Sequence, residues 1–454
     1  MKKTILSIAV IAAAFVAASC QKENLQENTA PEGNASIFTA TIETGADTKT
    51  TVERGTSPSV AYKTKWENTD KISINGVTYT ATPDATDATK ATFTKDSGDA
   101  PTGPFNAYFP ANMYSDSKAI LPASYTYTDG KYNMPMYAES DNTTLSFKNL
   151  CGVLAITVNG TDFTSVEKIE VFSDKQMNGV FTATADGVLT FDSKETLTDA
   201  DKKVTLTFAS AKAIAPEGSA TFYIPVPAGT HNPLAIKVTS GSTSKLMVTK
   251  KSGGVGVVRN TVYPIAFDGQ PITGTAKRTG DINVNWVQLW AGGPKFAEYN
   301  VGVTDGKAES YGGYYCWGKA IDKDSSGSYK GGESALSGDD DTATNLWGGN
   351  WRMPTQTDLE ALLSNCNVAW TTVGGVNGRK FTGKGAYASN SVFLPAAGYC
   401  SCGWAGNQGN AGDYWSSTPS GGDGACFLYF ASGGQGVGSY NRSSGYSVRA
   451  VLAE

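Results

Sequence analysis

Short segments with alternating hydrophobicity set the fold class of the first 275 residues of this chain. In the first of them, Phe38, Ala40 and Ile42 lie on one side of an extended backbone and polar residues lie on the other, which indicates a half-buried antiparallel strand. Asn75 and Gly76 form the sequence of a tight hairpin turn. Similar segments recur at residues 154–158, 168–172, 204–208, 221–224, 234–238 and 262–265. Because no long segment with helical periodicity interrupts them, they predict β-sandwiches.

The composition changes near residue 282, after which aromatic segments with frequent glycines, such as 311–318, precede one clear helix. Thr355 can cap this helix, and Asp358, three residues later, can complete a capping box. We therefore expect an α+β domain, separated from the sandwiches by the polar segment 269–281, which contains Pro and Gly and is expected to be a linker. The apolar stripe of the helix consists of Leu359, Leu362 and Leu363.

A glycine- and serine-rich stretch lies near the end of the sequence. Between Cys400 and Gly445 there are 12 glycines and 8 serines in 46 residues, and no Lys, Glu or Met. Aromatic blocks such as 427–430 interrupt it, which distinguishes it from a disordered low-complexity segment. Binding loops also use Tyr, Ser, Gly and Asn, because Tyr offers a large contact area with few rotatable bonds. We therefore expect a folded scaffold that displays a binding surface.

Several motifs around this stretch carry a resemblance to a known family. They are WGGNWRMPT at 347–355, AAGY at 396–399, DYWSST at 413–418 and RSSGYSVR at 442–449. With them, the region resembles the variable proteins of diversity-generating retroelements and the formylglycine-generating-type domains, which share a C-type-lectin-like fold. In the retroelement family, adenines of Asn-type codons are randomised, which never yields Lys, Glu, Gln, Met or Trp. The resemblance implies that Trp404, Gln408 and Gln435 are unvaried; a fixed, non-diversified domain is the alternative.

The first half carries a second resemblance. Its threonine-rich first strand, the turn at 66–70, the block LSFKNLCGVL at 145–154 and the ending RNTVYPI at 259–265 resemble the fimbrillin-like lipoproteins that build type V pili. That family has two stacked transthyretin-like β-sandwiches, joins subunits by donor-strand exchange and can lose its first strand to an Arg-directed protease. Arg54 is the only arginine before residue 259, so the resemblance implies cleavage there; an ordinary surface arginine is the alternative.

The N-terminus has the pattern of a targeting segment. Lys2 and Lys3 precede an apolar run at 5–18, which is followed by Ser19 and Cys20. Small residues directly before Cys20 predict cleavage of a lipoprotein signal, with the lipid on Cys20; an ordinary signal peptide is the alternative. No other stretch of 18 or more apolar residues exists, so we expect membrane contact only through the lipid. The net charge of -5 disfavours nucleic-acid binding.

Few residues are suited to catalysis or metal binding. His231 is the single histidine, and no Ser-His-Asp or Cys-His site can be assembled around it. The cysteines lack the spacing of zinc sites, and their disulfide pattern stays open. The acidic run 339–341 lacks the spacing of an EF-hand and is expected to lie in a solvated loop. The Glu-Pro-Asn and Gln-Pro-Asp tripeptides of calcium-dependent lectins do not occur. We expect no enzymatic activity, no cofactor and no metal.

These observations combine into a mainly β chain, with two transthyretin-like β-sandwiches followed by an α+β C-type-lectin-like domain. The expected parts are a signal peptide (1–20), a tether (21–35), a first fimbrillin-like sandwich (36–148), a second sandwich (149–268), a linker (269–281) and the lectin-like variable domain (282–454).

We expect a cell-surface adhesin, an outer membrane lipoprotein that acts as a pilus tip subunit because a globular domain replaces a free donor strand. Its expected partners are other fimbrillin-type pilins and a protein or glycan ligand on a host, bacterial or phage surface. The alternatives are a structural pilin without a ligand, a fixed glycan-binding lipoprotein, and a glycan-processing protein that uses Asp413 and Asp423 as its carboxylate pair. The expected ligand-binding residues are Ser401, Trp404, Asn407, Asn410, Asp413, Ser420, Asp423, Phe427, Tyr429, Val437, Ser439, Tyr440, Asn441, Ser443 and Ser444.

Overall fold

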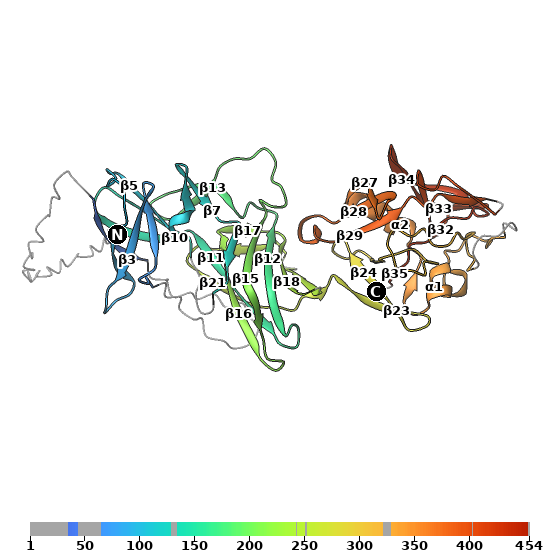
Figure 1. Ribbon diagram of the computed structural model, residues 1–454, viewed down its shortest axis with the longest axis horizontal. Coiled ribbons are helices and arrows are strands. Elements are labelled where there is room, and N and C mark those ends of the chain that lie inside the picture. The colour runs from blue at the N-terminus through green and yellow to red at the C-terminus, as the bar shows by residue number, and fades with distance from the viewer. Residues whose placement is uncertain are drawn as a thin grey trace, which may run out of the picture.

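The computed structural model describes residues 35–43, 65–128, 134–241, 243–249, 252–320, 328–401 and 403–452. Strands dominate these residues and helices are few, which confirms the expected mainly β class. Three bodies follow one another in a row, with the N-terminal barrel at one end and the C-terminal domain at the other (Figure 1). No helix among the described residues is long and apolar enough to cross a membrane.

Seven strands of the first body close into a barrel. β1 (Ile37–Ile42) lies between a parallel neighbour, β10 (Thr144–Asn149), and an antiparallel one, β4 (Lys90–Lys95). Every second side chain of β1 is buried, and Phe38 is fully enclosed, as the alternating sequence predicts. The remaining barrel strands are β2 (Lys71–Ile74), β3 (Val77–Pro83), β5 (Phe105–Phe109) and β9 (Met136–Ser140).

Two sheets of the second body share one core. β11 (Cys151–Asn159) is the central strand of the small sheet, and β12 (Ser165–Ser173) lies inside the larger one. Ile156 of β11 and Ile169 of β12 are fully buried in the same cluster, as in a sandwich. The small sheet also contains β16 (Ser219–Pro227) and β21 (Val262–Ala266), and the larger one contains β22 (Gln270–Pro271), β19 (Thr243–Val248), β18 (Leu234–Ser240), β15 (Lys203–Ala213) and β8 (Ser124–Thr126).

Part of the first half of the sequence joins the second body. β7 (Lys118–Leu121) pairs with β13 (Gly179–Ala183), and β8 pairs in parallel with β15. The sequence places residues 114–126 in the first sandwich, whereas these long-range ladders assign them to the second body. Other short elements here are η1 (Ala111–Met113), β6 (Tyr114–Ser115), β14 (Leu189–Phe191), β17 (Gly229–His231) and β20 (Val255–Val257).

The third body combines small sheets with two α-helices. β35 (Val451–Leu452) lies between β25 (Lys295–Ala297) and β26 (Trp351–Arg352) in the main sheet. Helix α2 (Gln356–Asn365) packs against the sheet formed by β32 (Ala411–Pro419), β33 (Gly424–Ala431) and β34 (Gly434–Asn441). The other elements are β23 (Thr273–Arg278), β24 (Ile282–Gln288), η2 (Gly338–Asp340), α1 (Thr342–Trp347), β27 (Asn367–Val373), β28 (Val376–Thr382), η3 (Gly385–Tyr387), β29 (Ser391–Pro395), β30 (Tyr399–Ser401) and β31 (Trp404–Gly406).

Helix α2 begins at the cap that the sequence predicts. Thr355 Oγ1 accepts a hydrogen bond from the Asp358 N–H at 3.1 Å, and the Asp358 carboxylate accepts one from the Thr355 N–H at 2.9 Å. Leu359 and Leu362 are buried and Leu363 is partly buried in one core cluster, which confirms the predicted stripe.

The acidic run 339–341 contains a helix start rather than only a solvated loop. Asp341 caps α1, because its carboxylate accepts a hydrogen bond from the Thr344 N–H at 2.9 Å. It also accepts one from the Met353 N–H at 2.9 Å. Asp341 is 1% exposed, and its desolvation raises the pKa of the carboxyl despite these bonds. Its role in the structure is therefore to join α1 to the strand before α2.

Residues 269–281 belong to two sheets and do not form a separate linker. β22 pairs with β19 in the second body, and β23 pairs with β24 in the third. Between them, the Ile272 N–H donates to the Ser244 carbonyl at 3.2 Å, and the Ile272 carbonyl accepts from the Gln288 N–H at 2.9 Å. Ile272 is buried in a cluster that spans both bodies and contains Phe172, Ala235, Leu246 and Tyr387.

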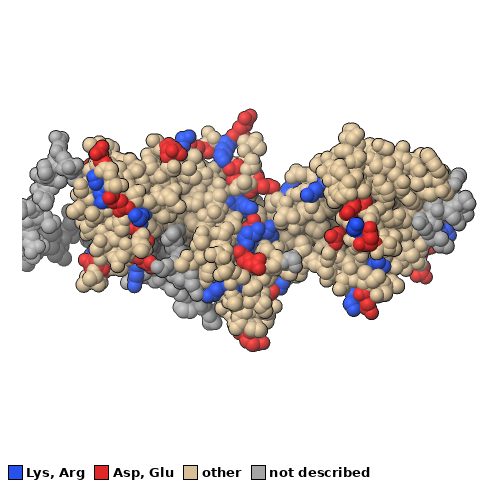
Figure 2. Space-filling view, viewed as in Figure 1, with Lys and Arg blue, Asp and Glu red and all other residues tan. Residues whose placement is uncertain are grey.

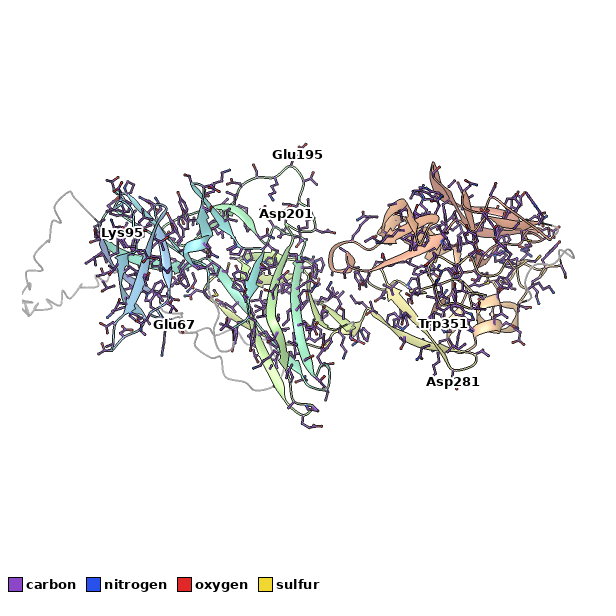
Figure 3. The ribbon with its side chains drawn as sticks, viewed as in Figure 1. Glu67, Lys95, Glu195, Asp201, Asp281 and Trp351 are labelled. Atoms are coloured by element: carbon purple, nitrogen blue, oxygen red, sulfur yellow. The ribbon has the colours of Figure 1, made fainter. Side chains whose placement is uncertain are left out.

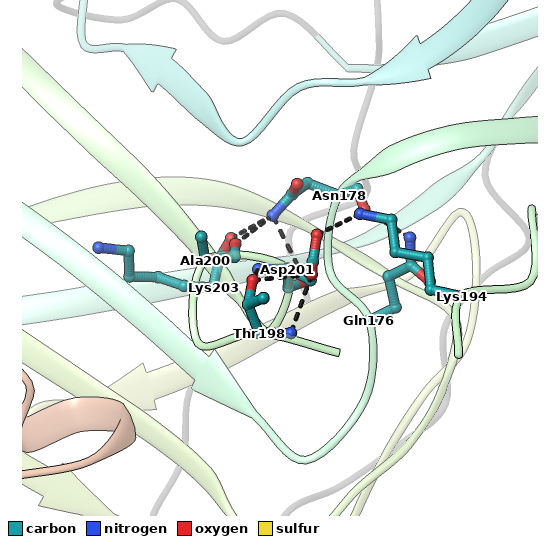
Figure 4. A network of polar contacts seen from close by, with 7 residues as sticks. All are labelled: Gln176, Asn178, Lys194, Thr198, Ala200, Asp201 and Lys203. Carbon is teal, nitrogen blue, oxygen red and sulfur yellow. Dashed lines mark hydrogen bonds and ion pairs between the residues drawn. The ribbon is translucent and has the colours of Figure 1, made fainter. Parts of the chain in front are cut away.

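A polar network orders a loop of the second body that reaches the third. Asp201 accepts hydrogen bonds from the Thr198 N–H at 2.9 Å and the Thr198 hydroxyl at 2.8 Å, and it pairs with Lys194 (Figure 4). The Lys194 ammonium, followed by the Thr198 donors, lowers the pKa of the Asp201 carboxyl to about 2. In the same loop, the Asp199 carboxylate accepts a hydrogen bond from the Gly385 N–H of the third body at 2.9 Å.

Candidate binding face

The sheet β32-β33-β34 has one side covered by α2 and one outward side, which is open at Tyr429 and Tyr440 and joins a second core cluster at Trp415 and Phe427. Side chains of β33 alternate between the two sides, because successive residues of a strand point in opposite directions. Leu428 and Phe430 point to the covered side, where they join a core with α2. Phe427 and Tyr429 therefore point to the outward side.

The register of the sheet places further residues on the outward side. Asp413 lies opposite Tyr429, and Tyr429 lies opposite Gly436. Trp415, which is two residues after Asp413 on β32, lies opposite Phe427. Residues directly opposite each other share a face, so these side chains form two rows across the sheet.

Two further segments extend this side beyond β32. The Ser447 N–H donates to the Asp413 carbonyl at 3.0 Å. Gly445 exchanges two backbone hydrogen bonds with Cys400, at 2.7 and 2.9 Å, so the hairpin β30-β31 lies next to this segment. Tyr446 lies between the two connections, and its ring joins those of the sheet.

Aromatic rings cover the outward side. The ring centroids of Trp415 and Tyr446 are 4.4 Å apart, those of Phe427 and Tyr446 are 4.9 Å apart, and those of Phe427 and Tyr429 are 5.8 Å apart. Tyr440 joins them at 6.1 Å from Tyr446. These separations are typical of favourable aromatic pairs. The surface is called the aromatic face below, and it consists of Tyr399, Trp404, Asp413, Phe427, Tyr429, Tyr440 and Tyr446.

Three side chains of the aromatic face are open to solvent. Trp404, Tyr440 and Tyr429 are 69%, 56% and 45% exposed. No other Phe, Tyr or Trp in the described part of the chain is classed as exposed. Because exposed apolar groups that gather in one patch often mark an interaction site, this surface is the candidate binding site of the chain.

Glycines make room for the exposed rings. A Cβ atom at Gly436 would lie 2.6 Å from the hydroxyl oxygen of Tyr429. In the hairpin, a Cβ atom at Gly406 would lie 3.0 Å from Tyr399 and 3.1 Å from Trp404. The rings therefore rest against bare backbone, and the glycines of this region serve the packing of the aromatic face.

Asp413 is the ionisable acid of the aromatic face. Asp413 is partly buried, and desolvation raises the pKa of the carboxyl to about 6. No hydrogen bond or ion pair to this carboxylate is found within the described ranges. Burial and the nearby Asp413 charge both raise the pKa of the Tyr446 phenol. The aromatic face thus has an acidic centre without a compensating charge.

Two buried arginines support the aromatic face from within the domain. The guanidinium carbon of Arg442 lies 4.3 Å from the ring centroid of Trp317, and its Nε donates to the Gly424 carbonyl at 2.8 Å. Arg449 Nε donates to Asn300 Oδ1 at 2.9 Å, and burial lowers the pKa of this guanidinium to about 10. Both positive charges are therefore directed into the core and away from the face.

The structure brings five of the predicted binding residues together. Asp413, Phe427, Tyr429 and Tyr440 lie on the outward side of the sheet, and Trp404 lies on the adjoining hairpin. Eight others lie in turns or near strand ends: Ser401, Asn407, Asn410, Ser420, Asp423, Asn441, Ser443 and Ser444.

Two predicted binding residues, Phe427 and Val437, are less accessible than the sequence suggests, and a third, Ser439, is exposed but lies on the other side of the sheet from the exposed rings. Phe427 is only 9% exposed and belongs to the core cluster that contains Trp415. Val437 is partly buried against the cluster on the covered side. Ser439 shares the side of Val437, because residues two apart on a strand point the same way. Because side chains alternate along β34, Val437 and Ser439 point away from the side that carries Tyr440.

Tyr399 and Tyr446 belong to the aromatic face, although the sequence analysis does not select them. They become direct neighbours through the bridge between Cys400 and Gly445, which joins residues far apart in the chain. Tyr446 lies in the motif RSSGYSVR at 442–449, which the sequence offers only as part of the family resemblance. The available signal was the alternation of small and aromatic residues around it, Gly445-Tyr446-Ser447.

Several predicted features are structural or lie elsewhere. Cys20 and Arg54 are outside the described residues. Cys366 and Cys426 are buried thiols, and desolvation raises the pKa of Cys366 to about 12. His231 is buried in β17, and desolvation lowers its pKa. Within the described ranges, no group of three or more His, Cys, Asp or Glu side chains is arranged to hold a metal ion.

Asp413 and Asp423 are too far apart for a glycosidase pair. Asp413 lies opposite Tyr429, whereas Asp423 precedes β33 and accepts a hydrogen bond from the Tyr329 hydroxyl at 2.8 Å. Residues 423 and 429 are six apart along an extended backbone, which corresponds to about 20 Å at roughly 3.3 Å per residue. Glycosidase carboxylates lie about 5 to 10 Å apart.

Comparisons with known proteins give matches of low similarity. No protein-family model matches it, and no curated protein matches it significantly. One similar solved structure is a "putative cell adhesion protein" from Bacteroides ovatus ATCC 8483, with 14% identity, a TM-score of 0.29, and coverage of 51% of this chain and 90% of that one. Another of the same description, from Bacteroides eggerthii DSM 20697, has 15% identity, a TM-score of 0.24, and coverage of 52% and 86%.

A third similar structure is a fimbrial protein from Bacteroides ovatus ATCC 8483. It has 9% identity and a TM-score of 0.24, and the match covers 92% of this chain and 99% of that one. TM-scores in this range do not establish a shared fold. The geometry of the aromatic face therefore carries the functional argument.

Proposed function

We propose that this chain is a cell-surface adhesin that binds its ligand through the aromatic face of the C-terminal domain. The observation that carries this proposal is the gathering of Trp404, Tyr429 and Tyr440 on one outward surface, from a hairpin and two sheet strands. Tyr and Trp are the residues that most often dominate binding energy at protein interfaces. The polar residues in the surrounding turns supply an adaptable rim.

The rigidity of this surface also favours binding. Strand ladders hold Tyr429 and Tyr440, and glycine backbone supports the Tyr429 ring. Aromatic side chains held in this way lose little conformational entropy when a ligand covers them. An ordinary solvated loop surface has no such support.

The test is replacement of the three exposed rings in the full chain. In the variant Trp404→Ala, Tyr429→Ala, Tyr440→Ala, we expect protein-coated beads to lose attachment to a panel of epithelial and bacterial cells. The matched control is Val188→Ala, Val258→Ala, Ile282→Ala, which removes exposed apolar side chains elsewhere. Circular dichroism should show folded protein in both variants.

The contrary outcome identifies the structural-pilin alternative. If the wild-type chain attaches to cells and the triple aromatic variant attaches equally well, the aromatic face is not the binding site. If no cell type binds wild-type beads above the control level, the chain has no adhesive role on these cells. Phe427 is left unchanged because it contributes to the core.

Presentation on a fimbrillin-type pilus, with donor-strand exchange, is part of the same proposal. β1 alone connects β10 and β4 in the barrel, so its removal would open a groove of strand width between them. Arg54 follows β1 in the chain, and cleavage there would separate β1 from the rest. We expect Arg54→Ala to retain its first strand and to fail to assemble with other pilins. Equal assembly of this variant would contradict the cleavage.

We propose further that the chain is a lipoprotein modified at Cys20 and a tip subunit. β35 is enclosed between β25 and β26, so it is not free to be donated to a neighbour. The purified chain should therefore not form fibres by itself, and long fibres without other pilins would contradict the tip position. The variant Cys20→Ser tests the lipidation. We expect it to leave the membrane fraction and to lack the mass of the lipid.

Diversification of the C-terminal stretch is a separate part of the proposal. Sequencing of the 3' end of the gene in related isolates should show substitutions confined to adenine-matched codons between about residues 399 and 444, beside a near-copy repeat and a reverse transcriptase. An invariant 3' end without a repeat would leave a fixed lectin-like adhesin. Either result is compatible with binding at the aromatic face.

A further inference from the structure

The acid at the centre of the aromatic face has no partner of its own. Asp413 projects from β32 on the same side as Tyr429, which lies directly opposite it. Burial holds its carboxyl in surroundings that disfavour the charged form. Elsewhere in the described part of the chain, the more deeply buried acids Glu170 and Asp341 have ion pairs or capping hydrogen bonds. Asp413 lacks both.

Among the residues of the domain that the structure describes, no basic side chain is placed to neutralise this acid. Between residues 399 and 444, Arg442 is the only Lys or Arg. Its guanidinium is committed to Trp317 and to the carbonyls of Gly424 and Gly332. Figure 2 shows that the part of the C-terminal domain around β34 is almost free of charged residues in this view, whereas both signs are visible on the second body.

The groups around Asp413 are aromatic. Tyr429 faces it from β33, Tyr446 from the segment after β34, and Tyr399 from the hairpin next to Tyr446. On its own strand, Trp415 follows on the same side. None of these side chains is a base, so the only full charge on this surface is negative.

We propose that the aromatic face recognises a lysine or arginine side chain of a protein ligand, and that the cationic group of this side chain binds at the Asp413 carboxylate. This inference rests on the proposed function and names the ligand chemistry of the same site. A cation at this position would supply the ion pair that Asp413 lacks. The faces of the surrounding rings would attract the same cation through their quadrupoles.

A protein ligand fits the surface better than a small molecule. The rings lie on an outward sheet face, and their centroid separations of 4.4 to 6.3 Å are those of packed protein side chains. A long lysine or arginine stem can cover such rings while its charged end reaches the acid. The ion pair is partly removed from water, so it contributes more here than an exposed pair would.

A random peptide library displayed on phage provides the probe. The full chain, immobilised at pH 7.5, should select peptides with lysine or arginine at one shared position. A synthetic copy of a selected peptide, without His, Asp or Glu, should bind Asp413→Asn at least about tenfold more weakly. Its norleucine analogue, which lacks the charge, should bind wild-type protein as weakly as the parent peptide binds Asp413→Asn.

The pH dependence gives an independent readout. Since the pKa of the Asp413 carboxyl is about 6, its ionised fraction falls about tenfold between pH 7.5 and pH 5.0. Peptide affinity should fall by about the same factor, while affinity for Asp413→Asn stays constant. The matched control is Asp281→Asn, because Asp281 is 86% exposed and lies at the end of the domain away from β34 (Figure 3). This variant should bind like the wild type.

The outcomes separate the inference from the proposed function. Selected peptides that require Tyr429 but contain no shared basic position would overturn the cationic ligand and leave the binding face in place. Equal binding of the lysine peptide by wild type and Asp413→Asn would also overturn it. Selection of no peptide by the wild-type chain would overturn both the cationic ligand and a peptide-binding role for the aromatic face.

Discussion

The ring of Tyr429 rests on the backbone of Gly436, where a Cβ atom would lie 2.6 Å from the phenol oxygen. The two residues face each other across β33 and β34, so the contact is fixed by strand register. An exposed tyrosine is thereby held in one place without a side chain beneath it. The contact explains why a glycine-rich strand borders the aromatic face.

Gly436→Ala should therefore displace Tyr429 and weaken binding. The methyl group would meet the phenol, and the ring would have to leave its position because the strand backbone cannot move away. We expect cell attachment to fall several-fold, with a change in unfolding free energy below about 1 kcal/mol at this exposed site. Attachment assays and thermal unfolding measure the two effects. Gly433→Ala is the control, since a Cβ atom there meets nothing within 4 Å.

Asp413→Asn should stabilise the C-terminal domain at neutral pH. The carboxyl pKa is raised from 3.8 to about 6 in the folded state, so the unfolded state loses its proton first as pH rises. Folding is therefore favoured by protonated Asp413 at low pH, and this contribution is lost as pH rises through about 6. The asparagine variant avoids the loss, which is on the order of 3 kcal/mol at pH 7.5.

Urea unfolding followed by tryptophan fluorescence measures this difference, because eight of the nine tryptophans follow residue 282. The advantage of Asp413→Asn over wild type should shrink as pH is lowered from 7.5 to 4.0. An advantage that is constant with pH would show that the ionised carboxylate is not its source. If the advantage shrinks as expected, the ionised carboxylate lowers stability, and a variant that is more stable but binds cationic peptides less well is what a residue retained for binding should give.

Arg442 should be essential for folding rather than for ligand contact. Its removal would take away the hydrogen bonds that its guanidinium donates to the carbonyls of Gly424 and Gly332, and it would leave the buried face of Trp317 without its packing partner. Each hydrogen bond from a charged group contributes about 1.5 to 3 kcal/mol, so Arg442→Ala should lose about 3 kcal/mol or more. Lys307→Ala, an exposed change in the same domain, should be neutral. Urea unfolding checks both, and a stable Arg442→Ala domain would contradict this role.

The features predicted correctly from the sequence are those that depend on residues close together in the chain. The capping box of Thr355 and Asp358 involves residues three apart, and the Leu359 stripe follows helical periodicity. Alternation likewise places the buried residues of β1, including Phe38. Such features depend on the backbone geometry of one element, so one segment of sequence contains the information.

The features that the sequence does not predict depend on long-range pairing. Residues 269–281 are polar and contain Pro and Gly, yet each half completes a sheet whose other strands lie elsewhere in the chain. Tyr446 enters the aromatic face only because Gly445 bridges to Cys400. The burial of Phe427 depends on Tyr446 in the same way. Composition indicated a binding surface in this region, but only the register shows which rings lie outward.

The second and third bodies should move as one unit in solution. Domains joined by small polar interfaces usually move relative to each other. Here Ile272 bonds to both bodies, an apolar cluster surrounds it, and Lys237 Nζ of the second body donates to Ser389 Oγ of the third at 3.1 Å. Lys237 is itself fixed by an ion pair with Glu170 at 2.9 Å.

Tyr387→Ser should loosen this junction, because it removes the largest side chain that the third body contributes to the shared cluster. With fluorescent labels at residues 186 and 305, the wild-type chain should give one narrow distance distribution, and the variant should give a broad one. Tyr263→Ser, a half-buried change within the second body, is the control and should keep the narrow distribution. A broad distribution in the wild type would contradict the rigid junction. A rigid junction would hold the aromatic face at a fixed orientation to the second body.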